Sequence, residues 1–192
     1  MTIEIVPVMA EQKDILRNLL EKYEYEFSQY DDEDVNSLGL YGYDWLDCYW
    51  TEENRFAFFI KVQGKLAGFF MVNDYPESGV KTDYSMAEFF VMHKYRCGGV
   101  GSYAAKWAFD RFQGTWQLKR HPKNTASVRF WDRVVNEYTG GEYRLETGYP
   151  GTEYGDGTFG EFLFFSTVAA QKSGMSVRRA LPEDAEYDRI LD

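Results

Sequence analysis

Short apolar runs alternate along the chain with segments in which apolar residues recur at helical spacing, and this pattern predicts a succession of strands and helices. Short apolar runs with strand character lie at residues 2–6, 55–62, 65–74, 87–92, 115–119, 143–147 and 161–167. Apolar residues spaced along one helix face lie at about residues 11–28, from Val100 to Ala108 and from Ser127 to Val135. Because these helices fall between strands, the pattern predicts an α/β domain.

Two turn signals indicate how the first strands are connected. Gln63 and Gly64 separate the runs 55–62 and 65–74, which is typical of a tight antiparallel hairpin. Residues 76–79 form a second turn that leads into the run 87–92. We therefore expect sequential antiparallel strands in the first half of the sheet.

The stretch 86–112 combines a strand, a glycine turn and an amphipathic helix without interruption. Arg96, Gly98, Gly99 and Gly101 come directly before or at the expected helix start. The first turn of a helix offers free backbone N–H groups and a positive dipole end, and glycine lets a bulky anion approach them. A phosphate or pyrophosphate is the natural ligand, and Arg96 could add a charged contact.

Composition narrows the class of protein. A chain of 192 residues is long enough for one well-packed domain, and its net charge of -10 argues against nucleic acid or an anionic membrane as partner. No apolar run approaches the roughly eighteen residues of a membrane span, and no leader pattern opens the chain. Cys48 and Cys97 are the only cysteines, so we expect a soluble cytoplasmic protein without a disulfide framework or metal site.

Between residues 23 and 50, aromatic side chains are interleaved with carboxylates. One interpretation is a wall for a cationic ligand, through cation–π and ion-pair contacts. The other is a solvated acidic loop beside ordinary helix-packing aromatics, and both stay open.

Two motifs resemble the GCN5-related N-acetyltransferase (GNAT) family. The spacing Arg96-x-x-Gly99-x-Gly101 on a strand-to-helix turn resembles its acyl-CoA-binding motif, and the series Asn124, Ala126, Phe130 and Trp131 resembles its fourth-helix pattern. The likeness covers most of residues 2–167. It implies the GNAT (acyl-CoA N-acyltransferase) fold, a mixed and mostly antiparallel sheet flanked by helices, in one domain over residues 1–168.

The same residues allow other interpretations of the glycine turn. The run from Gly99 to Ala104 also fits the loose G-x-G-x-x-A dinucleotide fingerprint, which needs a repeated βαβ unit and an acidic residue about twenty positions on. Here the preceding strands look antiparallel, and the next strand ends in Lys119 and Arg120. A Walker loop is excluded because no Gly-Lys-Ser/Thr follows. A purely structural helix start is the remaining alternative.

The resemblance implies acetyl-CoA as co-substrate and no metal. In the family the glycine loop, here residues 97–102, wraps the pyrophosphate, while backbone groups of the central strand pair with pantetheine and polarise the thioester. Asn124 is expected near the thioester. The expected cofactor-binding residues are therefore Phe89, Phe90, Val91, Arg96, Cys97, Gly98, Gly99, Val100, Gly101, Ser102, Asn124 and Trp131.

Glu88 is the candidate general base, because apolar neighbours on the strand would raise the pKa of its carboxyl toward neutrality. A structural Glu bonded to another element is the alternative, and His93 and His121 are weaker candidates for the base. Trp131 stands where many family members carry a tyrosine thought to protonate the departing thiolate. An indole cannot do so, so Tyr95 or Tyr103 stands in or the thiolate leaves unaided.

The expected activity is transfer of the acetyl group of acetyl-CoA to a primary amine of a small or peptidyl acceptor. Polyamine, aminoglycoside, amino acid and protein N-terminus all stay open as acceptors. A GNAT-fold module that binds acyl-CoA without transferring acetyl is the alternative, and a dinucleotide oxidoreductase is a weaker third.

The end of the chain departs from a single-domain pattern. Residues 169–175 look like a linker, and residues 176–192 resemble the opening strand and helix start of a second GNAT domain. A truncated second domain, a strand added to a neighbouring chain in a homodimer, and a charged tail all stay open.

Overall fold

A computed structural model of the chain describes residues 1–170 and contains one sheet, in the order β1-β2-β3-β4-β5-β7-β6. Neighbouring strands are antiparallel except for β4 and β5, which run parallel. The prediction of a mixed, mostly antiparallel sheet is confirmed, and the doubly wound parallel sheet of a dinucleotide-binding domain is excluded. The strands are β1 (Ile3–Pro7), β2 (Phe56–Val62), β3 (Lys65–Asn73), β4 (Tyr84–Val91), β5 (Thr115–Arg120), β6 (Tyr143–Thr147) and β7 (Glu161–Ser166).

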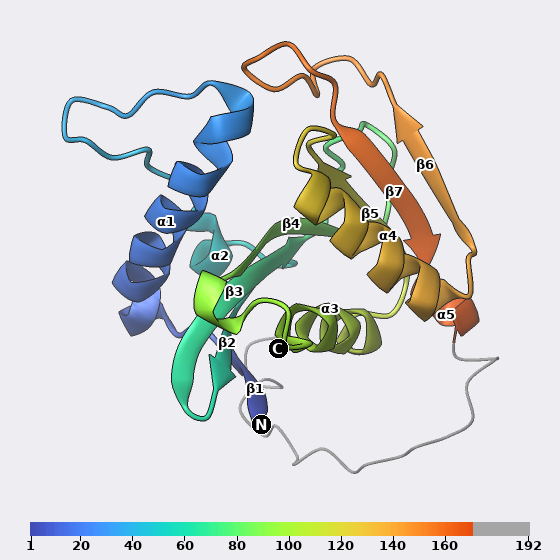
Figure 1. Cartoon of the computed structure of the whole chain (residues 1–192), viewed down its shortest axis with the longest axis horizontal. Helices are drawn as coiled ribbons and strands as arrows, with labels where there is room; N and C mark the ends of the chain where they lie inside the picture. Colours follow the sequence, from blue (N-terminus) through green and yellow to red (C-terminus); the bar gives the residue numbers. More distant parts are fainter. Residues whose placement is uncertain (171–192) are drawn as a thin grey trace.

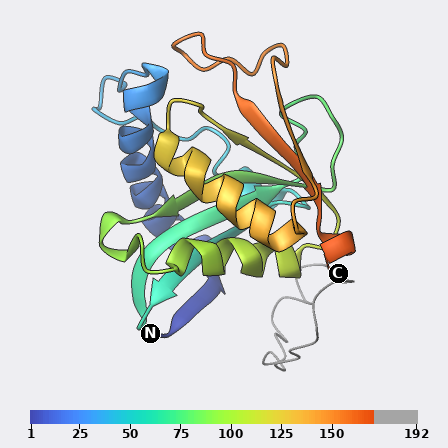
Figure 2. The ribbon, with the colours of Figure 1, turned by 45° about the vertical axis from the view of Figure 1, so that its right-hand side comes forward.

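Helices cover both faces of the sheet. Helix α1 lies on one face, while α3 and α4 pack side by side on the other (Figures 1 and 2). Two short 3-10 turns, η1 (Ala10–Gln12) and η2 (His93–Tyr95), come before α1 and α3. The helices are α1 (Lys13–Asp31), α2 (Cys48–Thr51), α3 (Val100–Arg111), α4 (Thr125–Thr139) and α5 (Thr167–Ala170).

The alternation of side chains along β2 and β3 divides the core between these two faces. Phe58 and Phe70 stack with ring centroids 5.0 Å apart in the cluster on the α3 and α4 side. Phe59 and Phe69 are buried in the cluster on the α1 side. Successive residues point to opposite faces of a strand, and burying each such ring contributes roughly 1.5–3 kcal/mol. The unbroken apolar runs in the sequence therefore mark strands that are covered on both faces.

Some predicted boundaries need correction. The central strand begins at Tyr84 rather than at residue 87, because Tyr84–Met86 pair in parallel with Trp116–Leu118. Helix α1 starts after a 3-10 turn and continues three residues beyond residue 28, to Asp31. Two side chains expected on buried helix faces, Ile15 and Tyr103, are 41% and 46% exposed.

Strand β4 parts from β5 halfway along its length. The parallel pairing ends at Met86 and Leu118, and a register shift in the β3–β4 pairing leaves Ala87 as a bulge. Met92 N–H donates to the carbonyl of Ala67 on the β3 side (2.8 Å). Backbone groups alternate in direction along a strand, so the N–H groups of Phe89 and Val91 face the opening toward β5.

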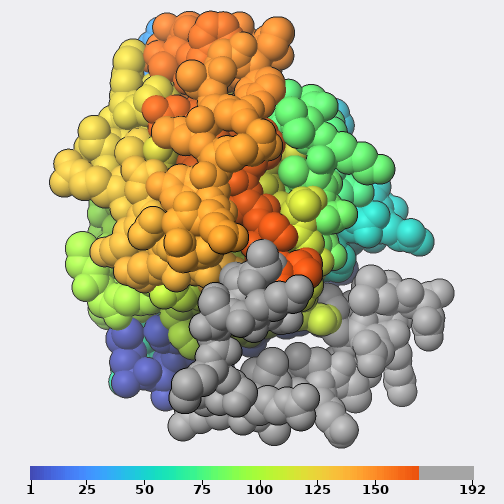
Figure 3. Space-filling model, turned by 90° about the vertical axis from the view of Figure 1, so that its right-hand side faces the viewer, coloured from blue at the N-terminus to red at the C-terminus, as the bar shows by residue number. Residues whose placement is uncertain are grey.

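The long connection between β6 and β7, residues 148–160, rises above the two strands (Figure 3) and reaches toward the C-terminal end of α1 (Figure 1). Gly155 lies directly against the backbone of Asp31, where a Cβ would collide with the carbonyl oxygen. A glycine is therefore needed at this close approach. The connection closes one end of the space between α1 and β5.

The predicted linker and tail lie mostly outside the described residues. Residues 169 and 170 belong to α5, and residues 171–192 lie beyond the described part. Over residues 1–170, no helix is both long and apolar enough to cross a membrane. In the same residues, no group of three or more His, Cys, Asp or Glu side chains is placed to hold a metal ion.

Candidate active site

A cavity of about 1420 Å³ opens where β4 and β5 separate. Its walls come from the second half of α1, from β4 and the glycine turn, from the end of β5, and from the face of α4 that looks toward α3. A cleft of this size falls above the usual range for small-molecule sites, about 300–1,000 Å³. It has room for a long cofactor together with a second substrate.

The glycine turn fixes the N-terminal end of α3. Cys97 and Gly99 have left-handed backbones, with φ of 60° and 82°, and Gly99 is the residue that precedes the helix. No atom lies within 4 Å of a Cβ built on Gly99, so the backbone conformation is what requires glycine there. The predicted placement of the glycines at a helix N-terminus is confirmed.

Gly101 has a different role from Gly99. A Cβ on Gly101 would lie 3.0 Å from the ring of Phe130 on α4 and 3.6 Å from Val91. Glycine here lets α4 approach the first turn of α3, beneath the cavity. The sequence pattern predicted one role for both glycines, namely to let an anion approach. In the structure, Gly99 is required by its backbone conformation and Gly101 by its packing against Phe130.

Most expected cofactor-binding residues line the cavity. Gly98 and Val100 do not, and the Val100 side chain is buried in the core. Asn124 lines the cavity and caps α4, where its side chain accepts the Ser127 N–H (3.1 Å). Trp131 is buried edge-on against Phe89. The lining members are Phe89, Phe90, Val91, Arg96, Cys97, Gly99, Gly101, Ser102, Asn124 and Trp131.

Arg96 is held in place by four neighbours, one of which is His93, whose Nδ1 lies 3.2 Å from Arg96 Nη1. Its Nε donates to the carbonyl of Val91 (2.6 Å), its Nη2 donates to Glu26 (2.6 Å), and its guanidinium lies over the Phe90 ring. Glu26 also contacts His93 Nε2 (2.7 Å), so one carboxylate of α1 holds two side chains of the turn. Sequence reasoning missed Glu26, because seventy positions separate it from Arg96.

Two further arginines of the cavity wall were also missed. Arg129 and Arg133 lie one helical turn apart on α4, and both line the cavity. Arg133 Nη2 is 3.4 Å from Ser102 Oγ in the first turn of α3. Their i, i+4 spacing after Asn124 was the available signal. Together with Arg96 they give the glycine-turn end of the cavity positive charge in a protein of net charge -10.

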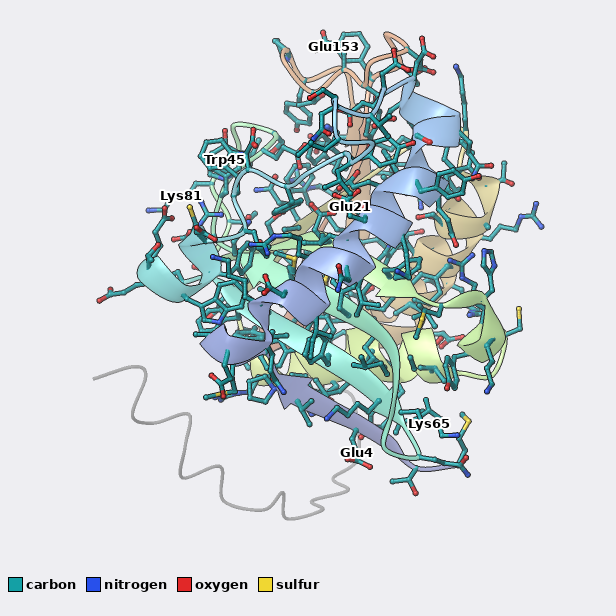
Figure 4. The ribbon with its side chains drawn as sticks, turned by 90° about the vertical axis from the view of Figure 1, so that its left-hand side faces the viewer. Glu4, Glu21, Trp45, Lys65, Lys81 and Glu153 are labelled. Atoms are coloured by element: carbon teal, nitrogen blue, oxygen red, sulfur yellow. The ribbon has the colours of Figure 1, made fainter. Side chains whose placement is uncertain are left out.

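Glu88 lies on β4 and is contacted by the hydroxyls of two tyrosines, Tyr23 of α1 and Tyr43. Tyr43 Oη donates to Glu88 Oε1 (3.0 Å) from the connection between α1 and α2. That connection is tied to α1 by Glu21, whose carboxylate accepts the N–H groups of Tyr41 (3.0 Å) and Gly42 (2.8 Å). Glu21 lies midway along α1, and Trp45 farther along the same connection stays 65% exposed (Figure 4).

Burial raises the pKa of the Glu88 carboxyl to about 7, although hydrogen bonds from the hydroxyls of Tyr23 and Tyr43 oppose the shift. Glu24 shows the same effect: burial and the charge of Glu88 raise its pKa to about 8. Burial also raises the pKa of Tyr23 and of Tyr43, so both remain protonated hydrogen-bond donors at neutral pH. This half of the site therefore holds carboxyl groups that titrate near neutrality.

Glu88 itself is not part of the cavity wall. Its neighbours Ala87 and Phe89 line the cavity, and so does Tyr23, whose hydroxyl is directed at Glu88. A proton could therefore reach Glu88 from the cavity through Tyr23 or one water molecule.

Comparisons with known proteins agree with this geometry. The model of the acetyltransferase (GNAT) family matches residues 13–135, whereas no curated protein matches the sequence. Spermidine N-acetyltransferase from Vibrio cholerae, solved with CoA and spermine, superposes with a TM-score of 0.60 and 11% identity, covering 88% of this chain and 98% of its own.

Two further solved structures share the fold. Ribosomal-protein-S18-alanine N-acetyltransferase from Escherichia coli gives a TM-score of 0.53 at 12% identity, over 94% of this chain and 100% of its own. An aminoglycoside 6'-N-acetyltransferase complexed with coenzyme A gives 0.55 at 12% identity, over 87% and 97%. At such identities the likeness concerns the fold. Because the family model spans well over half of the sequence, this chain belongs to the GNAT family of acetyltransferases.

Proposed function

We propose that this protein transfers the acetyl group of acetyl-CoA to a primary amine. The observation that carries the proposal is that one cavity joins a glycine turn suited to phosphates and an unpaired edge of β4, with a buried carboxyl group that titrates near pH 7 directly behind its wall. Each of these features meets one requirement of the reaction. The acetyltransferase neighbours of the fold, two of them solved with CoA, support the choice of co-substrate.

The glycine-turn end suits the pyrophosphate of CoA. Free N–H groups at the start of α3 can donate to phosphate oxygens, and the helix dipole favours the negative charge. Arg129 and Arg133 add positive charge from α4, and Arg96 adds it if it exchanges Glu26 for a phosphate. The pantetheine arm would then run along β4.

The unpaired edge of β4 suits the thioester. An N–H group of Phe89 or Val91 can donate to the thioester oxygen, where negative charge develops during attack. Oxyanion donors of this kind contribute roughly 3–4 kcal/mol to lowering the barrier. The carbonyl group of Phe89 can accept a hydrogen bond from an amide group of pantetheine, whereas that of Val91 already accepts the Nε–H of Arg96.

Glu88 is the proposed general base. A primary amine has a pKa near 10.4 and is mostly protonated at neutral pH, so it must lose a proton before it attacks. The amine nitrogen then forms a bond with the acetyl carbon, the C–S bond breaks, and CoA leaves as thiolate. The proton of the ammonium passes through Tyr23 or a water molecule to Glu88 before the attack. The second proton, which the nitrogen loses as the amide forms, goes to solvent. Such catalysis contributes about 10²- to 10⁴-fold.

The leaving thiolate has no assigned proton donor. Trp131 is buried and its indole N–H is not an acid near neutral pH. A thiol pKa near 8.5 makes departure as thiolate feasible without such a donor. We therefore propose unassisted departure.

A cationic amine suits the opposite end of the cavity. Burial and the charges of Glu88 and Asp31 raise the pKa of Glu24, so acidic groups are gathered beside α1. The aromatic rings of Phe27 and Tyr30 line the same end. Structural neighbours named as N-acetyltransferases of spermidine, an aminoglycoside and a ribosomal-protein alanine support an amine acceptor.

A CoA-binding module without transferase activity is the second candidate. The observation that favours it is the position of Glu88 behind the cavity wall. Release of thiol from acetyl-CoA across a panel of amines, with calorimetric titration of CoA, separates the two. Amine-dependent release supports the enzyme; CoA binding without release by any amine supports the module; and no CoA binding contradicts both.

A further inference from the structure

His121 is a buried histidine at the acceptor end of the cavity that the proposed reaction does not use. It follows directly on β5 and is 1% exposed, yet its side chain contributes to the cavity wall. Its ring lies among Phe27 and Tyr30 of α1 and Tyr154 of the β6–β7 connection, with the Tyr154 ring centroid 4.3 Å away. Two separate segments of the chain, α1 and the β6–β7 connection, thus enclose one imidazole.

The backbone fixes the tautomer of this imidazole. Nδ1 of His121 accepts the backbone N–H of Lys123 (3.1 Å), so Nδ1 carries no proton. In the neutral ring the proton must then be on Nε2, which makes Nε2 a hydrogen-bond donor. A ring held in this way has no free lone pair with which to accept a proton from an amine. This geometry argues against His121 as the general base.

The Nε2–H group has no partner among the described residues. The nearest carboxylate oxygen, Asp156 Oδ1, is 3.6 Å away, beyond hydrogen-bond distance. Asp156 is already occupied by the Lys123 ammonium and by the N–H and hydroxyl of Thr158. Buried donors are almost always paired in native proteins, so an unpaired donor on a residue of the cavity wall points to a ligand.

A second unpaired atom lies in the same corner. Asp31 is 8% exposed and its Oδ1 has no partner in residues 1–170. Its titration is influenced by both His121 and Asp156, which places the three side chains together. Two carboxylates beside the Nε2–H group disfavour an anionic ligand. The group that fits is therefore a neutral oxygen.

We propose that His121 Nε2–H binds a neutral oxygen, hydroxyl or carbonyl, that the acceptor carries near its reactive amine. This inference rests on the proposed function, because it names the acceptor class for the same cavity. An amino alcohol or a peptide-like amide has the required oxygen. A plain polyamine does not, and a free carboxylate would meet Asp31 and Asp156.

The first test compares two acceptors of one skeleton, 1,3-diaminopropane and 1,3-diamino-2-propanol, with β-alaninamide as the carbonyl arm. His121→Asn keeps an acceptor near the Lys123 N–H but removes the Nε2–H donor, whereas His121→Gln keeps a donor at the position of Nε2. We expect the KM for the oxygen-bearing acceptors to rise about three- to tenfold in His121→Asn. The KM for the plain diamine and the kcat should not change, and His121→Gln should restore the KM.

A comparison of the KM for 1,3-diamino-2-propanol with that for β-alaninamide shows whether the site prefers a hydroxyl or a carbonyl oxygen. Equal KM changes for acceptors with and without oxygen would overturn the proposal, and so would no change with any acceptor.

The second test does not depend on acetyl transfer. The chain has two histidines, so the ring ¹⁵N spectrum at pH 8 is readily assigned with His121→Asn. We expect a proton on Nε2 of His121, and its resonance should shift when 1,3-diamino-2-propanol is added to the CoA-saturated protein but not with 1,3-diaminopropane. A proton on Nδ1, or no selective shift, would overturn the proposal. If the selective shift occurs while thiol release fails, the proposed transferase activity alone is contradicted.

Discussion

The two ends of the cavity differ in the groups that they offer to a ligand. The glycine-turn end uses backbone groups, namely the start of α3 and the unpaired edge of β4, with arginines on the surrounding walls. The α1 end uses side chains, including tyrosine hydroxyls around Glu88 and the buried ring of His121. Backbone donors suit an anion that every acetyl transfer shares, whereas side chains suit an acceptor that differs between enzymes. The contrast explains how one fold keeps its cofactor while its acceptor changes.

The largest effect is expected from a substitution of Glu88, the proposed base at the α1 end. Glu88→Gln keeps the size of the side chain and a hydrogen-bonding oxygen, but it cannot take a proton. We expect kcat to fall by about 10²- to 10⁴-fold with no change in CoA affinity, measured by thiol release and calorimetry. A parallel loss of CoA affinity would show that the two ends are not separable.

The next effect concerns the backbone of the glycine-turn end. Gly99→Val places a β-branched residue at a φ of 82°, where such residues are strained. We expect CoA to bind at least about tenfold more weakly, because the start of α3 must change conformation; this is a strain of roughly 1–2 kcal/mol. Calorimetric titration of folded protein measures the loss.

Gly98→Ala is the matched control for Gly99→Val. Gly98 has an ordinary backbone conformation, and a Cβ there would meet no atom closer than 3.9 Å. CoA affinity should stay within about twofold of the original protein, since no strain is introduced. Equal losses for the two variants would contradict a specific backbone role for Gly99.

A smaller effect is expected at the contact between the two ends. Glu26 contacts Arg96 and His93 and brings negative charge to the cavity wall that we propose binds phosphates. Glu26→Gln should therefore tighten CoA binding about two- to fivefold, as expected for a partly exposed ion pair. Weaker binding in titrations at constant ionic strength would show instead that Glu26 positions Arg96 for the cofactor.

The smallest effect is on stability. The pKa of Glu24 is raised to about 8 in the folded protein, so the folded state binds a proton more tightly than the unfolded state does. Unfolding free energy should therefore fall as pH rises from about 4.5 to 8. Glu24→Gln should lessen this fall by about 1 kcal/mol, discounted for partial exposure. Denaturant unfolding at pH 5 and pH 8.5 measures the difference, and identical slopes would contradict the burial of this charge.

Sequence reasoning reached the glycine-turn end because that end is local. A strand, a turn and a helix follow one another within residues 84–111, so spacing alone predicts where the N–H groups lie. The same applies to the hairpin of β2 and β3, which Gln63 and Gly64 close. What spacing could not separate were Gly99 and Gly101, because the contact of Gly101 with Phe130 depends on helix packing.

The α1 end depends on contacts between residues far apart in the sequence. Tyr43 and Glu88 are 45 positions apart, and the 23–50 stretch offered many tyrosines and acids with similar local patterns. In the structure Tyr23 and Tyr43 face Glu88, while Tyr25 and Trp45 are 71% and 65% exposed. The path of the α1–α2 connection, held by Glu21, determines that Tyr43 rather than Trp45 faces the site.

The central claim, that Glu88 is the base of an acetyl transfer, is tested most directly by the pH dependence of amine-stimulated thiol release from acetyl-CoA. With a carboxyl pKa of about 7, the base is protonated and inactive at low pH, so kcat/KM should rise as pH passes through 7. In Glu88→Gln this rise near pH 7 should be absent. The same rise in both proteins, or no amine-stimulated release while CoA binds, would contradict the account.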